Sequence, residues 1–248
     1  MQYLFPMRIT RLVDLSVVVG PGTVVYPGDP EPRLATHATI ERDGFNLLSV
    51  SMGSQTGTHV DAPYHFDDAT PRIDALPLER FFGPAVVVDA TDLGERGRIT
   101  WDEHVAPVAD RLAPGTIVLL RTDWSTRYGT PAYFAHPFLD AEAARRLLAL
   151  GVRTICIDAI NLDETPDDDH PGEGFPVHHL IAEADGVIGE NFRNIAAIDW
   201  DDVVVSCFPI ALEAADGAPV RAVALQLDVP RFDAQRSGGL RSEGLPGN

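Results

Sequence analysis

Short apolar runs separated by turn residues recur along this chain and predict an α/β domain rich in strands. Residues 85–90, 116–121 and 153–157 are continuous apolar runs, which are typical of strands buried on both faces of a sheet. Residues 34–40 and 46–52 instead alternate apolar and polar positions on either side of a turn, which predicts a hairpin-like strand pair. Together these patterns indicate a β-rich fold with strands of mixed direction.

The clearest helix is predicted between two of the buried strands. Asp140 is a good N-cap residue, apolar side chains follow it at helical spacing, and Gly151 ends the pattern. Strand, helix and strand from 116 to 158 therefore predict one crossover unit. Weaker patterns predict further strands at 12–19, 203–208 and 220–229, and a helical segment at 101–112 that Pro107 would kink.

The chain shows no internal repeat and no linker, so a single domain is expected. Its 248 residues are 45% hydrophobic, which suits one domain with a sizeable core. We place this domain at residues 1–234. Residues 235–248 are rich in serine, glycine and proline and are expected to form a flexible tail.

The charge of the chain excludes several classes of partner. A formal net charge of −18 and a pI near 4.6 argue against nucleic acid and against anionic membrane surfaces, both of which need a basic footprint. No apolar stretch approaches the roughly 20 residues of a spanning helix, and residues 1–8 do not resemble a secretory signal. We therefore expect a cytoplasmic protein that acts on a small molecule.

Candidate chemistry is densest between residues 54 and 66. His59 and Asp61 are separated by one residue, so on an extended segment both side chains leave the same face. Zinc and manganese accept imidazole and carboxylate ligands together. The spacing alone is also compatible with a surface hydrogen bond beside a turn, so a metal site and a structural pair both stay open.

The run Gln-Thr-Gly-Thr-His-Val-Asp-Ala-Pro-Tyr-His-Phe at 55–66 closely resembles the signature His-x-Gly-Thr-His-x-Asp-x-Pro-x-His of the metal-dependent cyclase family of hydrolases, which includes bacterial kynurenine formamidase and isatin hydrolase. Further likeness extends over residues 12–228. The resemblance implies a mixed α/β fold of the swivelling β/β/α kind. It also implies a homodimer or homotetramer.

The same resemblance implies a second half of the metal site. The family uses a histidine and a glutamate twelve positions apart, and His178 and Glu190 have that spacing, whereas His179 does not. Adjacent helical histidines point about 100° apart, so only one of the two is expected to reach a common centre. The expected metal ligands are therefore His59, Asp61, His178 and Glu190.

Gln55 departs from the signature, which has histidine at this position. A glutamine oxygen is a neutral and weak ligand that suits zinc poorly. Gln55 is therefore expected either to be a weak ligand, in a site with one ion or with manganese, or to hydrogen-bond the substrate. Alternatively, it marks a relative that has changed substrate or lost activity.

We expect hydrolysis of a C–N bond in a small, aromatic amide, formamide or lactam, with Zn²⁺ or Mn²⁺ as cofactor and His65 as the general base. Trp124, in a loop after a buried strand, and Tyr64 are the expected substrate contacts; a small core under that loop explains Trp124 equally well. Two other functions stay open: a polyketide-type cyclase or dehydratase that uses the same site, and a metal-free ligand-binding protein.

Overall fold

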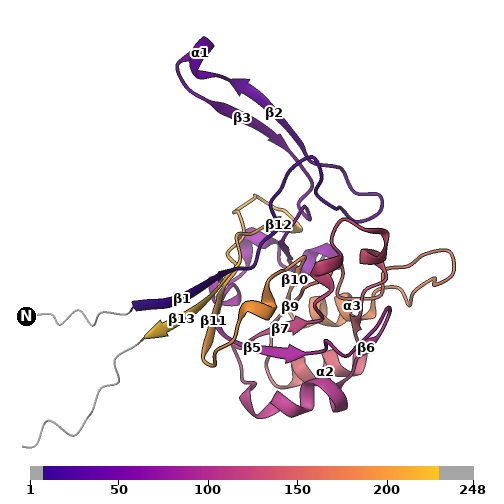
Figure 1. Cartoon of the computed structure of the whole chain (residues 1–248). Helices are drawn as coiled ribbons and strands as arrows, with labels where there is room; N and C mark the ends of the chain where they lie inside the picture. Colours follow the sequence, from indigo (N-terminus) through magenta and orange to yellow (C-terminus); the bar gives the residue numbers. More distant parts are fainter. Residues whose placement is uncertain (1–7, 229–248) are drawn as a thin grey trace, which may run out of the picture.

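A nine-stranded mixed sheet forms the centre of the computed structural model, which describes residues 8–228 (Figure 1). In spatial order its strands are β1 (Arg8–Asp14), β13 (Val223–Asp228), β11 (Val203–Ser206), β5 (Phe82–Asp89), β7 (Ile117–Arg121), β9 (Thr154–Ile157), β10 (Val187–Glu190), β4 (His59–Asp61) and β12 (Gly217–Pro219). The tail predicted at 235–248 lies outside the described residues.

The four central strands are parallel and carry the apolar core. β5, β7, β9 and β10 pair in parallel, and the apolar runs predicted at 85–90, 116–121 and 153–157 overlap the first three of them, each run extending one residue beyond its strand. Buried side chains pack on both faces of this part of the sheet. Because both faces of the sheet are covered here, these strands do not show the alternation of apolar and polar residues that is typical of a strand with one exposed face.

The predicted crossover unit is confirmed. Helix α2 (Ala141–Ala149) connects β7 to β9, and the Asp140 carboxylate accepts hydrogen bonds from the backbone N–H groups of Glu142 and Ala143. Helix α3 (Pro176–Glu183) packs against α2 and leads into β10. These two helices cover one face of the parallel strands (Figure 1).

Two predicted elements differ from the structure. The first strand was predicted at 12–19 but spans Arg8–Asp14, because after Asp14 the chain leaves the sheet and Val17 N–H donates to Thr58 Oγ1. The segment predicted as a kinked helix at 101–112 is a π-helical turn at Trp101–Val105 followed by a 3₁₀ segment at Ala106–Arg111. Pro107 has no N–H group and cannot continue an α-helix there.

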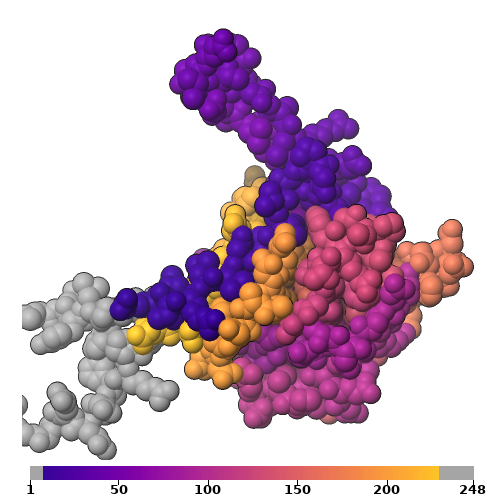
Figure 2. Space-filling model, viewed as in Figure 1, coloured from indigo at the N-terminus to yellow at the C-terminus, as the bar shows by residue number. Residues whose placement is uncertain are grey.

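A long hairpin stands away from the body of the molecule (Figure 2). It consists of β2 (Arg33–Ala38) and β3 (Leu47–Ser51), joined through the short helix α1 (Ile40–Asp43), and it forms a sheet of its own. This confirms the predicted strand pair. A third small sheet pairs β6 (Arg98–Ile99) with β8 (Phe138–Leu139). Within residues 8–228, no helix has the length and apolar character needed to cross a membrane.

Candidate metal centre

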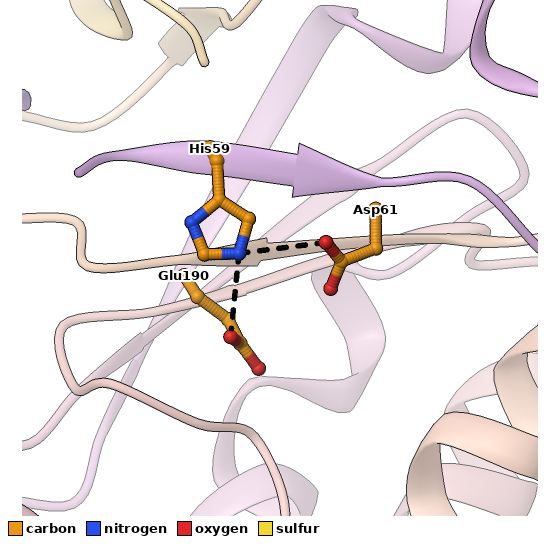
Figure 3. Close-up of side chains that lie close together, drawn as sticks. All are labelled: His59, Asp61 and Glu190. Carbon is orange, nitrogen blue, oxygen red and sulfur yellow. Dashed lines mark ion pairs between the residues drawn. The ribbon is translucent and has the colours of Figure 1, made fainter. Parts of the chain in front are cut away.

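The pairing of β4 with β10 brings two remote parts of the sequence together. These strands are antiparallel, and the register sets His59 directly opposite Glu190. His59 and Asp61 leave the same face of β4, and directly opposed residues of neighbouring strands share a face. All three side chains therefore converge (Figure 3), with His59 Nε2 3.4 Å from Asp61 Oδ1 and 3.5 Å from Glu190 Oε2.

His178 adds a second imidazole to this cluster from helix α3. Its Nε2 lies 3.4 Å from Glu190 Oε1 and 4.0 Å from Asp61 Oδ2. His179, the next residue on the helix, is exposed. The structure thus gathers His59, Asp61, His178 and Glu190, the four residues expected to ligate metal, while His179 points elsewhere.

Asp163 fixes both the start of helix α3 and the orientation of His178. Its carboxylate accepts hydrogen bonds from the backbone N–H of Val177 at 3.0 Å and of His178 at 2.9 Å, and from His178 Nδ1–H at 2.7 Å. Phe175, the residue that precedes the helix, supplies no capping side chain, so Asp163 satisfies these N–H groups instead. His178 is therefore held with its Nε2 directed at the cluster.

Each imidazole uses Nδ1 for a structural hydrogen bond and directs Nε2 at the carboxylates. His59 Nδ1–H donates to the Gly57 carbonyl at 2.9 Å, as His178 Nδ1–H donates to Asp163. A metal-ligating histidine normally has its second nitrogen engaged in this way, because the hydrogen bond selects the tautomer. Glu190 is oriented too, since Leu162 N–H donates to its Oε1 at 2.8 Å.

The electrostatics of the cluster favour positive charge. Burial alone would lower the pKa of His59, but Asp61 and Glu190 outweigh burial and raise it to about 9. The pKa of His178 likewise rises to about 10, because Asp163 and Glu190 outweigh burial. Two buried carboxylates facing two imidazoles thus stabilise a cation at this point.

The chemistry of the donor set fits a divalent metal. His59, Asp61 and Glu190 offer atoms that all lie within 4.8 Å of one another, and all three residues are buried. Asp61 Oδ1 is buried without a hydrogen-bond partner, although unpaired buried carboxylate oxygens are costly. A cation coordinated by this oxygen and by the two Nε2 atoms would satisfy all of them.

His65 belongs to a second group of polar side chains beside this cluster. It is the last residue of a 3₁₀ turn at Pro63–His65, and its Nδ1–H donates to Asp216 Oδ2 at 3.0 Å. Ser54 Oγ donates to Asp216 Oδ1 at 2.8 Å, and Gln55 Nε2 donates to Asp216 Oδ2 at 3.0 Å. Asp216 therefore orients His65 and also holds Gln55. The Gln55 Oε1 atom is buried and has no hydrogen-bond partner.

Both groups face one cavity of about 410 Å³. Tyr26, Phe66, Ile160 and Phe175 add aromatic and apolar surface to its wall, and Asp29, Asn161 and Asn191 add further polar groups. Ring centroids of Phe66 and Phe175 lie 5.6 Å apart, so the two rings form one apolar surface next to His178. The cavity thus combines an apolar wall with a few convergent polar groups, as small-molecule sites do.

Neither Trp124 nor Tyr64, the predicted substrate contacts, lines this cavity. Trp124 is 3% exposed, packs in the core and donates its indole N–H to the Ala132 carbonyl. The alternative that the sequence left open, a small core under the loop, is what the structure contains. The Tyr64 ring instead stacks under the Arg72 guanidinium, at 4.0 Å from its centroid.

Asp163 and Asp216 were not singled out from the sequence as site residues. Asp216 precedes β12, which pairs with β4, so that pairing carries it to His65 from 151 residues away. Asp163 reaches His178 across a loop. A chemical rule could have prompted a search for them: a histidine at a metal or catalytic site normally hydrogen-bonds a carboxylate or a carbonyl through its second ring nitrogen.

Comparison with known proteins gives consistent results. Residues 13–164 match the family model described as putative cyclase. A kynurenine formamidase from Bordetella petrii is 32% identical over 226 residues, which cover 88% of this chain and 99% of that protein.

Solved structures share the fold. Isatin hydrolase A from Ralstonia solanacearum superposes with a TM-score of 0.78 at 26% identity, over 87% of this chain and 91% of that one. A structure described as a potential metal-dependent hydrolase with cyclase activity gives 0.70 at 26% identity, over 89% and 99% of the two chains.

Proposed function

This chain belongs to the cyclase family, and from that premise we propose that it is a metal-dependent hydrolase of a C–N bond in a small aromatic amide, formamide or lactam. One observation carries the proposal: His59 and Asp61 converge with His178 and Glu190 in a buried cluster at the base of a cavity with aromatic walls. The formamidase and isatin hydrolase relatives support the reaction class.

We propose that His59, Asp61, His178 and Glu190 hold one divalent cation, Zn²⁺ or Mn²⁺. Two imidazoles and two carboxylates are a mixed donor set that both ions accept. Such a cation would acidify a water molecule and polarise the carbonyl group of the scissile amide. Gln55 is proposed as a substrate contact instead: Asp216 holds its amide nitrogen, and its Oε1 is left without a partner and can accept a hydrogen bond.

His65 is the proposed general base. Its Nδ1–H is committed to Asp216, so Nε2 is the nitrogen available to take a proton from the attacking water. Once protonated, the same imidazole returns that proton to the leaving nitrogen as the C–N bond breaks. The Asp216 carboxylate stabilises the imidazolium during the interval, and Ser54 holds that carboxylate in place.

The aromatic wall supports the choice of an aryl substrate. Phe66, Phe175 and Tyr26 offer flat apolar surfaces beside the polar cluster, and offset or edge-on contacts between rings add to area burial. Ile160 extends the apolar lining. An aryl ring held here would present its amide group to His65.

The test is hydrolysis of formanilide and of isatin by chain that has been stripped of metal and reloaded with Mn²⁺ or Zn²⁺. We expect activity only after reloading, with one oxygen from ¹⁸O-labelled water in the acid product. Activity that is equal before and after reloading would contradict the proposal. So would turnover of these substrates without incorporation of labelled oxygen.

We further propose that the chain assembles as a homodimer or homotetramer, with the projecting hairpin in the interface. Leu47, Leu48 and Val50 of β3 are each about half exposed, and Ile40 and Phe45 near the tip are 66% and 55% exposed. An apolar surface of this kind is typical of an interface. Sedimentation analysis of the chain with Leu48 and Val50 changed to serine would detect the dissociation that we expect. The cytoplasmic location stays a prediction from the sequence.

A further inference from the structure

Asn191, the residue after Glu190, is held by hydrogen bonds at three of its four polar groups. Its backbone N–H donates to the Ala159 carbonyl at 2.7 Å, and its backbone carbonyl accepts from Thr58 Oγ1–H at 2.7 Å. Its side-chain Oδ1 accepts from the Tyr133 hydroxyl at 2.8 Å. Because these contacts fix both the backbone and the amide group, they also fix the position of the fourth polar group, the Nδ2 nitrogen.

The backbone conformation of Asn191 turns its side chain toward the cavity. Neighbouring residues of a regular strand point to opposite faces, so the residue after Glu190 would normally face away from the metal cluster. Asn191 instead has φ of +56°, a left-handed conformation that asparagine adopts more readily than most residues. The alternation of the strand is thereby broken, and both Glu190 and Asn191 line the same cavity.

The Nδ2 group is the part of Asn191 that a ligand in the cavity can reach. Within residues 8–228 it makes no hydrogen bond, and it is not fully buried. The other polar groups of Asn191 are hydrogen-bonded, and the residue as a whole is only 3% exposed, so the exposed part at Nδ2 opens to the cavity. The wall therefore presents a fixed amide group with free N–H donors.

Tyr133 determines which end of this amide faces the cavity. Its side chain is fully buried, and burial raises the pKa of its hydroxyl group well above the usual value, so the group stays protonated. A buried tyrosine hydroxyl needs a hydrogen-bond partner, and Tyr133 donates to Oδ1 of Asn191. The Tyr133 ring is held in turn by an edge-on contact with Tyr128, at 5.2 Å between centroids. Nδ2 rather than Oδ1 is therefore directed at the cavity.

Most other donors in the described cavity wall are already engaged. Three of them donate to the Asp216 carboxylate, those of Ser54, Gln55 and His65. The second asparagine of the wall, Asn161, accepts from Asp163 N–H through its Oδ1. Burial raises the pKa of the Tyr26 hydroxyl, and a hydrogen bond from Asn161 partly offsets that rise, so the Asn161 amide is directed at Tyr26. Asn191 is thus the uncommitted amide beside the metal cluster.

We propose that Asn191 is a catalytic residue whose Nδ2–H donates a hydrogen bond to the carbonyl oxygen of the scissile amide, and that Tyr133 is its positioning residue. When the oxygen of water adds to the carbonyl carbon, the C=O π pair moves onto this carbonyl oxygen, which becomes negatively charged. The pair returns as the C–N bond breaks and the leaving nitrogen takes the proton held by His65. A donor that is already in place stabilises the charged oxygen more than the neutral substrate. This inference rests on the proposed function and adds a residue to its machinery.

The experiment compares formanilide with thioformanilide, in which sulfur, a weak hydrogen-bond acceptor, replaces the carbonyl oxygen. The kcat and KM of both are measured with metal-loaded wild-type chain, with Asn191→Gly and with Tyr133→Phe. Glycine suits a positive φ, so Asn191→Gly removes the amide without straining the backbone. Asn194→Gly is the matched control, because Asn194 has φ of +58° but is exposed and does not line the cavity. Comparing variants for each compound cancels the difference in intrinsic reactivity.

We expect Asn191→Gly to lower kcat for formanilide by about 10²- to 10³-fold, the usual effect of removing one oxyanion donor, and to change KM by less than about threefold. Thioformanilide should lose less than about tenfold. Tyr133→Phe should lower kcat for formanilide by about tenfold, again more than for thioformanilide, because the amide is then free to turn. Asn194→Gly should stay close to wild type. An equal loss for both compounds in Asn191→Gly, or in Tyr133→Phe if Asn191→Gly does not fold, would overturn the inference.

A binding measurement separates this inference from the proposed function. Phenylphosphinate carries a tetrahedral anionic group, which resembles the charged state formed when water adds to an amide. We expect calorimetry with metal-loaded chain to show binding about tenfold to a hundredfold weaker in Asn191→Gly than in wild type, as for the loss of a hydrogen bond to a charged group. If formanilide is not hydrolysed but this loss is found, the proposed reaction fails and the Asn191 donor stands. Equal affinities overturn the donor whatever the catalytic result.

Discussion

Replacement of Asp163 by asparagine tests how the protein prepares His178 for metal. Three donors converge on the Asp163 carboxylate: the N–H groups of Val177 and His178 and the Nδ1–H of His178. An asparagine can accept through its oxygen only, so its NH₂ group must face at least one of these donors. The imidazole can escape the conflict by moving its proton from Nδ1 to Nε2, and then Nε2 can no longer bind a cation.

The expected magnitude follows from this geometry. Loss of a carboxylate behind a metal-ligating histidine typically weakens metal binding by about 10- to 100-fold, which corresponds to about 1.4 to 2.8 kcal/mol. If the proton does not move, a buried donor is left unpaired, which costs about 1 to 3 kcal/mol of folding stability instead. We therefore expect Asp163→Asn to bind metal more weakly, to be less stable toward unfolding, or to show a smaller loss of both.

The assay is competition for Mn²⁺ or Zn²⁺ between the apo chain and a chromophoric chelator, together with thermal unfolding of the apo chain. Asp158→Asn is the matched control. Asp158 is also buried and accepts hydrogen bonds from Thr122 N–H and Oγ1–H, but it does not line the cavity. Both Thr122 donors reach the same Asp158 oxygen, which asparagine retains, so the control should keep metal affinity. Wild-type affinity and wild-type stability in Asp163→Asn would refute the assigned role of Asp163.

Three further predictions concern the catalytic group and the cation. His65→Ala should lower turnover by about 10²- to 10⁴-fold while metal content stays at the wild-type level; loss of the metal would mean that His65 is a ligand. Burial alone would lower the pKa of His65, but the hydrogen bond to Asp216 and the charge of Asp61 outweigh it and raise the pKa. Because the base works unprotonated, Asp216→Asn should move the acidic limb of the kcat/KM profile to lower pH, and an unmoved limb would contradict the pairing. Metal at about 100 times its Kd should add about 2.7 kcal/mol to the free energy of unfolding, measured by denaturant titration with and without chelator; equal midpoints would contradict a specific site.

The sequence was informative where chemistry is local. The spacing of His59 and Asp61 correctly placed them on one face of a strand, and the continuous apolar runs located β5, β7 and β9 within a few residues. The helix from Asp140 was predicted from its cap and its periodicity alone. In each case the signal lies within one element and needs no knowledge of its neighbours.

Contacts between elements that are distant in the sequence were harder to predict. Glu190 meets His59 only because β4 and β10 are antiparallel in one particular register, and register is set by the whole sheet. Only the family resemblance predicted that Glu190 and His59 share a site; their spacing in the sequence did not. Asp216 was missed because it approaches His65 through the pairing of β12 with β4. Trp124 was assigned to the substrate because burial within a loop leaves no periodic signal in the sequence.

The most direct test of the central claim is a crystal of the chain soaked in Mn²⁺ and measured for anomalous scattering. The account predicts one strong peak within about 2.5 Å of His59 Nε2, His178 Nε2 and carboxylate oxygens of Asp61 and Glu190. It also predicts that the peak disappears when Glu190 is changed to alanine. A wild-type crystal with no peak between these four side chains, or with peaks only at surface carboxylates, would contradict it.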